Sequence, residues 1–225
     1  MIIVYDKLAN LEDRCRIFIE TGSVLDTAHY IYHVKRVVEN AKLLLNRHPA
    51  DAEVVLPAAW LHDCVVLAKD HPNRKKASQM AAVKATDFLR ETGYPAEKLD
   101  AVTHAIIAHS YTADVKPQTI EAKIVQDADR LDALGAIGIA RCIIVGAKLN
   151  RPLYNAEDPF CTVREPDDTK WTIDHFYTKL FKLPGLMNTD AAKEIADKRI
   201  TYMKDFLNTL NDEIIIRSEI ETDAF

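Results

Sequence analysis

The spacing of apolar residues along the chain predicts helices rather than strands. Between Tyr30 and Leu45 the apolar positions recur with a period near 3.6, the repeat of an α-helix. These positions are Ile31, Val34, Val37, Val38, Ala41, Leu44 and Leu45, and Pro49 closes the region. Only 6 glycines and 9 prolines occur in 225 residues. So few breakers favour long helices over many short strands.

The same pattern predicts further helices, separated by polar loops. We expect the next helix over 52–64, with a late start or a kink at Pro57, because proline is unfavourable in a helix interior. A polar loop is expected at 70–76. Further helices are expected over 77–92, 95–110, 119–146, 172–183 and 190–212, the third of them long and apolar.

Residues 149–170 lose the helical periodicity and gather Asn, Pro, Asp and Glu, so we interpret them as a loop and a candidate lid. No internal repeat or low-complexity segment is evident. The simplest interpretation is one all-α domain over residues 1–225, a helical bundle with a C-terminal helical portion at 172–215.

Composition narrows the function classes. Hydrophobic residues make up 48% of the chain and charged residues 28%, which is typical of a soluble globular protein. A formal net charge of −5 argues against a dedicated nucleic-acid binder. No apolar run reaches the ~18 residues of a membrane-spanning helix, and the N-terminus lacks the features of a signal peptide. We expect a cytoplasmic monomer or homodimer with no membrane or nucleic-acid partner.

The cysteine pattern gives no metal or disulfide motif. The four cysteines are Cys15, Cys64, Cys142 and Cys161, and no two form a C-x-x-C pair. Cys64 directly follows a histidine and an aspartate, but we interpret it as a small buried residue rather than a ligand.

The candidate chemistry centres on His62 and Asp63, which follow the apolar run 54–61. Burying a charge without a partner is very costly, and a bound divalent cation would hold both side chains. His33 and Asp129 lie on other predicted helices and can converge with this pair in a bundle core. Asp127 and Asp132 compete with Asp129. Asp129 and Asp132 share a helix face, whereas Asp127 is expected to point elsewhere, nearer to solvent.

The ordered set of these residues resembles the H…HD…D signature of the HD-domain superfamily of metal-dependent phosphohydrolases. The match lies in residues 26–37, in Ala58-Ala59-Trp60-Leu61-His62-Asp63, in 106–110 and in 121–133, and it covers about residues 20–145. The sequence is similar to the small, stand-alone bacterial branch of this superfamily, which includes nucleotide pyrophosphatases and nucleotidases. The chain departs from that branch at Tyr30, where an aspartate often follows the residue matching His29.

The resemblance implies one divalent ion per chain, Mn, Mg or Fe, held by His33, His62, Asp63 and Asp129. It also implies hydrolysis of a phosphoester or phosphoanhydride, with a nucleotide as the expected substrate and metal-activated water as the nucleophile. Asp63 takes part through the metal, and Asp132 or His109 is the candidate proton acceptor. Two alternatives stay open: a di-iron oxygenase, which needs His104 and His109 as further ligands, and a nucleotide sensor without turnover.

Residues near the metal set are candidates for supporting roles. Arg36 lies one turn after His33, and Lys69 and Arg74 follow the His-Asp pair closely, so these three are candidate phosphate contacts. His29 lies one turn before His33 and could hydrogen-bond a ligand. Asp132 could instead orient a ligand or pair with a nearby cation.

Overall fold

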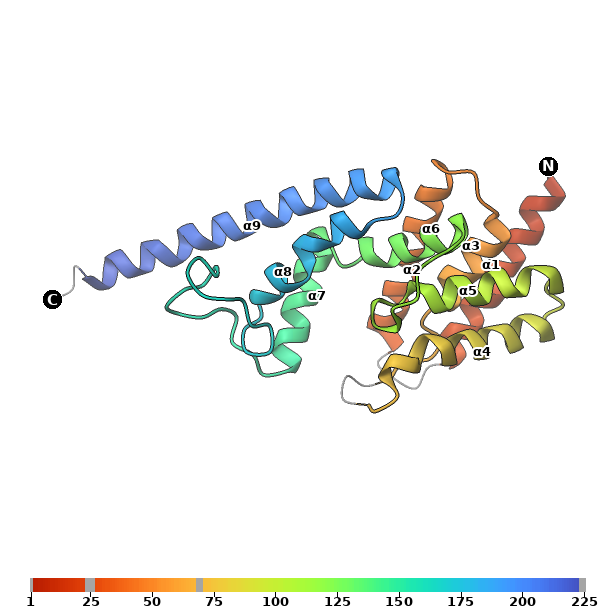
Figure 1. Cartoon of the computed structure of the whole chain (residues 1–225), viewed down its shortest axis with the longest axis horizontal. Helices are drawn as coiled ribbons and strands as arrows, with labels where there is room; N and C mark the ends of the chain where they lie inside the picture. Colours follow the sequence, from red (N-terminus) through yellow and green to blue (C-terminus); the bar gives the residue numbers. More distant parts are fainter. Residues whose placement is uncertain (1, 23–26, 68–70, 223–225) are drawn as a thin grey trace. The chain divides into compact units, whose positions relative to one another are not determined.

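The computed structural model describes residues 2–22, 27–67 and 71–222, and within them the regular structure is entirely helical (Figure 1). The side chains of 2–7, 27–30, 112 and 215–222 are outside the described set. The α-helices are α1 (Ile2–Gly22), α2 (Thr27–Leu45), α3 (Ala52–Leu61), α4 (Ala77–Glu91), α5 (Leu99–His109), α6 (Ile120–Leu131), α7 (Gly135–Lys148), α8 (Asp174–Thr178) and α9 (Asp190–Thr222). Short 3-10 helices lie at Arg74–Lys76, Ala96–Lys98, Tyr111–Ala113 and Leu180–Leu186. The all-α prediction is confirmed.

The chain divides into two compact units, Met1–Asp132 and Ala133–Phe225. The first contains α1 to α6, and the second contains α7, α8 and α9. The expectation of a single domain stays a prediction. Among the described residues, no helix is both long and apolar enough to cross a membrane.

The apolar stripes form the core of the first unit as their spacing predicts. On α2, the residues Val34, Val37, Val38, Ala41 and Leu44 are buried, and on α5 the face with Val102, Ala105 and Ile106 is buried. Helices α4 and α5 lie side by side, and α3 contacts α2, α5 and α6 (Figure 1). All residues of α3 from Val54 to Leu61 are buried, which explains why that run carries no polar residue before His62.

Pro57 lies inside α3 without delaying its start, so the expected late start is wrong, and the alternative of a kink stays a prediction. The helix begins at Ala52, because the Asp51 side chain accepts a hydrogen bond from the Glu53 backbone N–H at 2.9 Å and caps it. Pro57 has no N–H to donate to the carbonyl of Glu53. The Tyr94 hydroxyl donates to that carbonyl instead, at 2.7 Å, and this bond makes the proline tolerable.

Tyr94→Phe is therefore expected to lower the free energy of unfolding by about 1 kcal/mol, the net value of a typical hydrogen bond, because it leaves the Glu53 carbonyl without this donor. Urea denaturation would measure the change. Tyr32→Phe, at a tyrosine that is 59% exposed, is the matched control. Equal stability of the Tyr94 variant and the wild type would contradict this role.

The single long helix expected over 119–146 is also wrong, because the chain breaks between α6 and α7. Leu134 is extended, with φ −118° and ψ 163°, and Gly135 has φ +72°. This left-handed conformation favours glycine. The break ends α6 at Leu131 and leaves Asp132 at its C-terminus.

The other helix ends agree with the sequence signals to different degrees. Helix α4 ends at Glu91, just before Gly93, which has φ +72°. Helix α9 runs to Thr222, ten residues past the expected end at 212. Helix α1 had no counterpart among the elements predicted from the sequence.

In the second unit, residues 149–170 form a loop without helix, as predicted, and buried carboxylates organise it. Asp158 accepts hydrogen bonds from the backbone N–H groups of Thr162, Val163 and Arg164 at 2.9–3.1 Å. These donors lower the pKa of Asp158 below its usual range. Movement of this loop as a lid stays a prediction.

Asp158→Asn is expected to lower the melting temperature at about pH 7, because the neutral amide accepts these bonds less well. The pKa of Asp158 in the folded protein lies below the unfolded value of 3.8. The ionised carboxylate therefore stabilises the fold fully above pH 3.8, and this stabilisation is lost as the pH falls through the folded pKa. The difference in melting temperature, followed by circular dichroism, should therefore narrow in acid. A difference that is independent of pH would contradict this.

Candidate metal centre

Three helix ends and one helix interior bring the candidate ligands together in the first unit. His33 projects from α2, and His62 and Asp63 follow the last residue of α3. Asp129 lies in the last turn of α6, and His109 is the last residue of α5. A helix end lets two consecutive residues share one centre, which side chains ~100° apart in a continuous helix do less readily.

The ligand atoms of these residues lie within a few ångströms of one another. His33 Nε2 lies 3.4 Å from Asp129 Oδ1 and 4.0 Å from Asp63 Oδ2. His62 Nε2 lies 3.7 Å from Asp63 Oδ2 and 4.0 Å from Asp129 Oδ1. Two groups qualify as possible metal-binding sets, His33 with His62 and Asp129, and His62 with Asp63 and His109. The structure thus brings together all four ligands proposed from the sequence.

The three histidines present the same ring nitrogen to the centre. His33 Nδ1 contacts the Asp132 carboxylate at 2.7 Å. His62 Nδ1 donates to the Ala59 carbonyl at 2.7 Å, and His109 Nδ1 donates to the Ile106 carbonyl at 2.6 Å. Because the outer nitrogen donates in each case, Nε2 faces inward and carries the lone pair whenever the ring is neutral.

The electrostatics favour the protonation states that bind cations. Burial works against ionisation of Asp63, but the His62 and His109 rings outweigh it and lower the pKa of Asp63. The pKa of Asp129 is lowered in the same way, with burial opposing the effect of His33 and the other histidines. Burial lowers the pKa of His62, despite the neighbouring carboxylates. Ionised carboxylates and a neutral imidazole are the forms that coordinate metals.

The environment of His62 tests whether a metal fits. The residue is 0% exposed, and its Nε2 is buried without a hydrogen-bond partner. Buried polar atoms are rarely unsatisfied, because each such atom costs about 1–3 kcal/mol. Asp63 and Asp129 are 36% and 29% exposed at the side chain. A divalent cation bound here would satisfy Nε2 and keep a side open to solvent.

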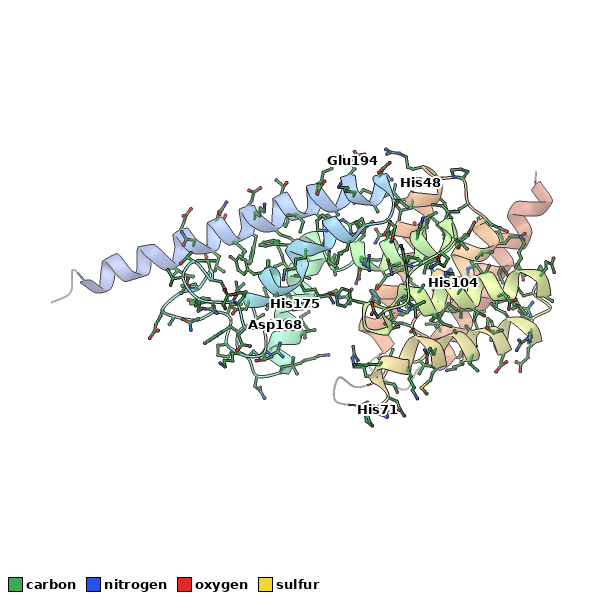
Figure 2. The ribbon with its side chains drawn as sticks, in the orientation of Figure 1. His48, His71, His104, Asp168, His175 and Glu194 are labelled. Atoms are coloured by element: carbon green, nitrogen blue, oxygen red, sulfur yellow. The ribbon has the colours of Figure 1, made fainter. Side chains whose placement is uncertain are left out.

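The histidine at the end of α5 joins the cluster, whereas the other histidine of that helix does not. His109 Nε2 lies 3.5 Å from Asp63 Oδ1, and burial, which lowers its pKa, is outweighed by Asp63, which raises it. His104, labelled on α5 in Figure 2, accepts a hydrogen bond from the Gln118 backbone N–H at 2.9 Å. The five-residue offset between them therefore separates the two rings, as the helical geometry predicts.

The residues proposed to contact phosphate or to orient the metal ligands differ in their hydrogen-bond partners. Asp132 and Arg36 pair with each other, and Asp132 Oδ1 accepts a hydrogen bond from Arg36 Nε at 2.6 Å. Their positions in the sequence do not indicate this pairing. Arg74 donates to the Leu67 carbonyl at 2.7 Å. The side chains of His29 and Lys69 lie outside the described residues.

Two neighbours of the ligands test the sequence interpretation further. Cys64 donates to the Ala81 carbonyl at 3.2 Å, and burial raises the pKa of its thiol to about 12, so it behaves as a packed thiol.

Asp127 is 0% exposed, so the expectation that it lies nearer to solvent is wrong. The carboxylate lies close enough to Arg130 to raise the pKa of that guanidinium, which burial lowers. A charged partner allows Asp127 to be buried.

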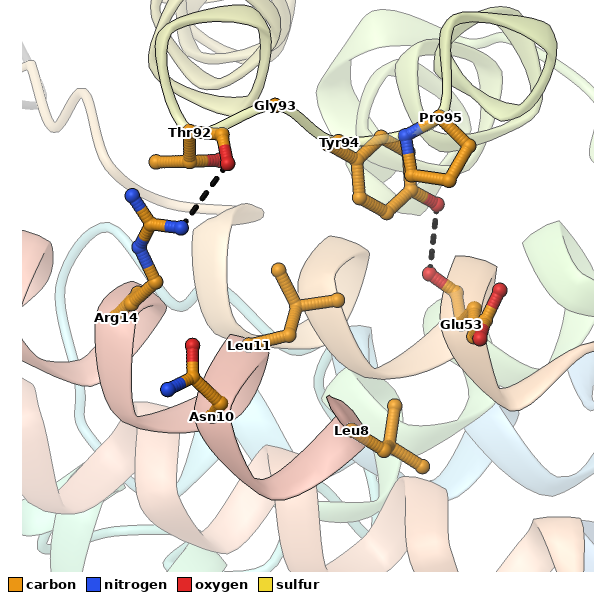
Figure 3. A pocket seen from close by; sticks show the side chains of 9 residues that line it. All are labelled: Leu8, Asn10, Leu11, Arg14, Glu53, Thr92, Gly93, Tyr94 and Pro95. Atoms are coloured by element: carbon orange, nitrogen blue, oxygen red, sulfur yellow. Dashed lines mark hydrogen bonds between the residues drawn. The ribbon is translucent and has the colours of Figure 1, made fainter. Parts of the chain in front are cut away.

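A cavity of about 400 Å³ lies elsewhere in the first unit (Figure 3). Its lining residues include Leu11, Arg14, Glu53 and Tyr94, and Arg14 donates to the carbonyl of Thr92, another lining residue, at 3.0 Å. Glu53 is at the start of α3 and His62 follows its end, so the two are about 13 Å apart along the helix axis. This cavity is therefore separate from the metal centre.

Comparison with known proteins agrees with the geometry. The family model described as HD domain matches residues 30–134, which include all four candidate ligands. The uncharacterised protein YpgQ of Bacillus subtilis is 33% identical over 192 residues, covering 84% of this chain and 85% of YpgQ.

Solved structures match nearly the whole chain. The crystal structure of YpgQ in complex with ADP has a TM-score of 0.70 at 30% identity, covering 92% of this chain and 96% of YpgQ. The crystal structure of an HD-superfamily hydrolase from Bacillus thuringiensis has a TM-score of 0.71 at 32% identity, and the match covers 93% of this chain and 97% of that hydrolase. The chain belongs to the HD-domain superfamily.

Proposed function

We propose that this protein is a metal-dependent phosphohydrolase that acts on a nucleotide. The carrying observation is the buried, unpartnered Nε2 of His62 within about 4 Å of two ionised carboxylates. His33, His62, Asp63 and Asp129 would hold one divalent ion. The ADP bound to YpgQ supports a nucleotide as the ligand.

The metal would supply two effects when bound: it acidifies a coordinated water and neutralises charge on a phosphoryl oxygen. Manganese, magnesium and iron all suit a set of two imidazoles and two carboxylates. The protein contributes the two negative charges of Asp63 and Asp129 and holds the inward-facing nitrogens of His33 and His62 through their outer hydrogen bonds. Preorganised ligands lower the cost of forming the site.

His109 is the described residue best placed to transfer a proton. Its Nε2 faces the same centre from α5, and the Ile106 carbonyl fixes the orientation of the ring. In its imidazolium form, with a second proton on Nε2, it can donate to a phosphoryl or leaving-group oxygen. Asp132 is less suited to accept a proton from water, because its carboxylate is 2% exposed and already accepts from His33 and Arg36.

A screen for phosphate and pyrophosphate release tests the proposal. Metal-free protein would be reconstituted separately with Mn²⁺, Mg²⁺ and Fe²⁺ and incubated with nucleoside mono-, di- and triphosphates. We expect hydrolysis that depends on the added metal, and the products identify the bond that is cleaved.

Measurements of nucleotide binding, metal content and oxygen consumption on the same reconstituted samples separate the alternatives. Nucleotide binding without turnover under all metals would replace the hydrolase with a sensor. Two irons per chain by metal analysis, together with oxygen consumption, would replace it with an oxygenase that uses His109 as a further ligand.

A further inference from the structure

We propose that Arg36 and Asp132 act on the metal centre as positioning residues, by fixing the ring of His33. The three residues form a chain of hydrogen bonds, the Arg36–Asp132–His33 relay. Asp132 Oδ2 accepts from His33 Nδ1 at 2.7 Å and from Arg36 Nη2 at 3.1 Å, and Oδ1 accepts from Arg36 Nε at 2.6 Å. The inference rests on the proposed function, because it requires His33 to be a ligand.

The chemistry of a carboxylate determines the tautomer of His33. An ionised carboxylate only accepts hydrogen bonds, so the contact with Asp132 requires the proton of the imidazole to be on Nδ1. The lone pair is then on Nε2, which lies 3.4 Å from Asp129 Oδ1 in the centre. A carboxylate behind a ligating histidine also increases the basicity of the ring, and such partners typically contribute 10- to 100-fold to metal affinity.

The support of His33 differs from that of the other two histidines. His62 and His109 each donate to a backbone carbonyl three residues earlier, at the end of their own helix. His33 lies within α2 and depends on a side chain from the end of α6, 99 residues away. The position of its ring is therefore set by tertiary structure, and a side-chain substitution can remove that support.

Arg36 has the role of holding Asp132. The Asp132 side chain is 2% exposed, and a buried carboxylate is unfavourable without a compensating cation. The guanidinium donates from two nitrogens to the two carboxylate oxygens, a planar geometry that a lysine ammonium cannot reproduce. His33 and Arg36 are one turn apart on α2, so both reach the same carboxylate. This geometry assigns Arg36 to the relay rather than to direct phosphate contact.

Metal affinity and imidazole tautomer test the relay. Mn²⁺ binding to metal-free protein would be measured by calorimetry for the wild type, Arg36→Lys and Asp132→Asn. We expect both variants to bind Mn²⁺ about 10- to 100-fold more weakly, and hydrolysis to recover in part at saturating Mn²⁺. Long-range proton–nitrogen spectra of the metal-free wild type should place the His33 proton on Nδ1, and in Asp132→Asn the Nε2-protonated form should appear.

Control variants separate failure of the relay from failure of the proposed function. Lys35→Gln removes a cation next to Arg36 that pairs with Glu20 at 3.2 Å, and it should leave Mn²⁺ affinity unchanged. If His33→Ala binds Mn²⁺ like the wild type, the proposed site itself is wrong. If His33→Ala loses Mn²⁺ while Arg36→Lys and Asp132→Asn keep wild-type affinity and tautomer, only the relay is wrong. Should Asp132→Asn fail to fold, Arg36→Lys decides the question.

Discussion

Asp63→Ala is expected to abolish divalent-metal binding and to reduce nucleotide hydrolysis by about 10³-fold or more, while the helical fold survives. The carboxylate lies 3.7 Å from His62 Nε2 and is 36% exposed, so its removal leaves no cavity in the apolar core. The loss follows because metal catalysis contributes several kcal/mol of transition-state stabilisation. Calorimetry with Mn²⁺, phosphate release and circular dichroism measure the three effects.

The neighbouring cysteine provides the matched control for this variant. Cys64→Ser retains a donor for the Ala81 carbonyl and should bind Mn²⁺ and hydrolyse nucleotides like the wild type. An Asp63→Ala protein with wild-type turnover would show that the catalytic centre lies elsewhere.

Asp174→Ala is expected to lower the free energy of unfolding of the second unit by about 3–5 kcal/mol, the typical cost of breaking a buried ion pair. Asp174 is 0% exposed, and its carboxylate accepts from Arg164 Nη1 at 2.5 Å and Nη2 at 2.7 Å. It also accepts from the Asp167 backbone N–H at 2.6 Å. Removing the carboxylate leaves the guanidinium, which is 19% exposed at the side chain, without its counter-charge.

Urea denaturation, monitored by circular dichroism and by Trp171 fluorescence, measures this loss. Trp171 is a local probe because the Arg164 guanidinium lies 4.5 Å from its ring centroid. Asp205→Ala, at an exposed aspartate of α9, should change stability by less than about 0.5 kcal/mol. Arg164→Ala combined with Asp174→Ala should cost less than the sum of the single changes. An unchanged midpoint for Asp174→Ala would contradict the assigned role.

Two buried carboxylates in the 149–178 region, those of Asp158 and Asp174, also hold the candidate lid. Asp158 and Asp174 bind consecutive parts of the loop through backbone and side-chain donors. His175 and Asp168, labelled in Figure 2, add a contact of 2.6 Å between α8 and the loop. None of these partners was evident from the sequence, because they are joined only after the loop turns back on α8.

Sequence periodicity was sufficient to locate the helices that carry the candidate metal ligands. The stripe of α2 and the apolar run of α3 depend on local spacing, which a linear pattern records directly. The ordered positions of His33, His62-Asp63 and Asp129 added the resemblance that the family match confirms. These features depend on residue type and order, so they required no knowledge of packing.

The predictions that were wrong, and the contacts that were not predicted, concern features that depend on tertiary partners or on one backbone angle. The break before α7 depends on the left-handed conformation of Gly135. The apolar pattern of this segment continues through the break and does not indicate it. Burial of Asp127 depends on the nearby charge of Arg130. The contact of Arg36 with Asp132 joins residues 96 positions apart. Such partners become visible only once helices are packed, and a helix-face argument for one segment cannot supply them.

We propose that His33, His62, Asp63 and Asp129 hold one catalytic divalent ion, and a titration of turnover with metal measures this. Metal-free wild-type protein would be titrated with Mn²⁺ at saturating nucleotide while phosphate or pyrophosphate release is followed. We expect no hydrolysis in the presence of chelator, and a rate that rises with bound Mn²⁺ and saturates at one ion per chain. Full hydrolysis in chelator, or saturation only at two ions per chain, would contradict it.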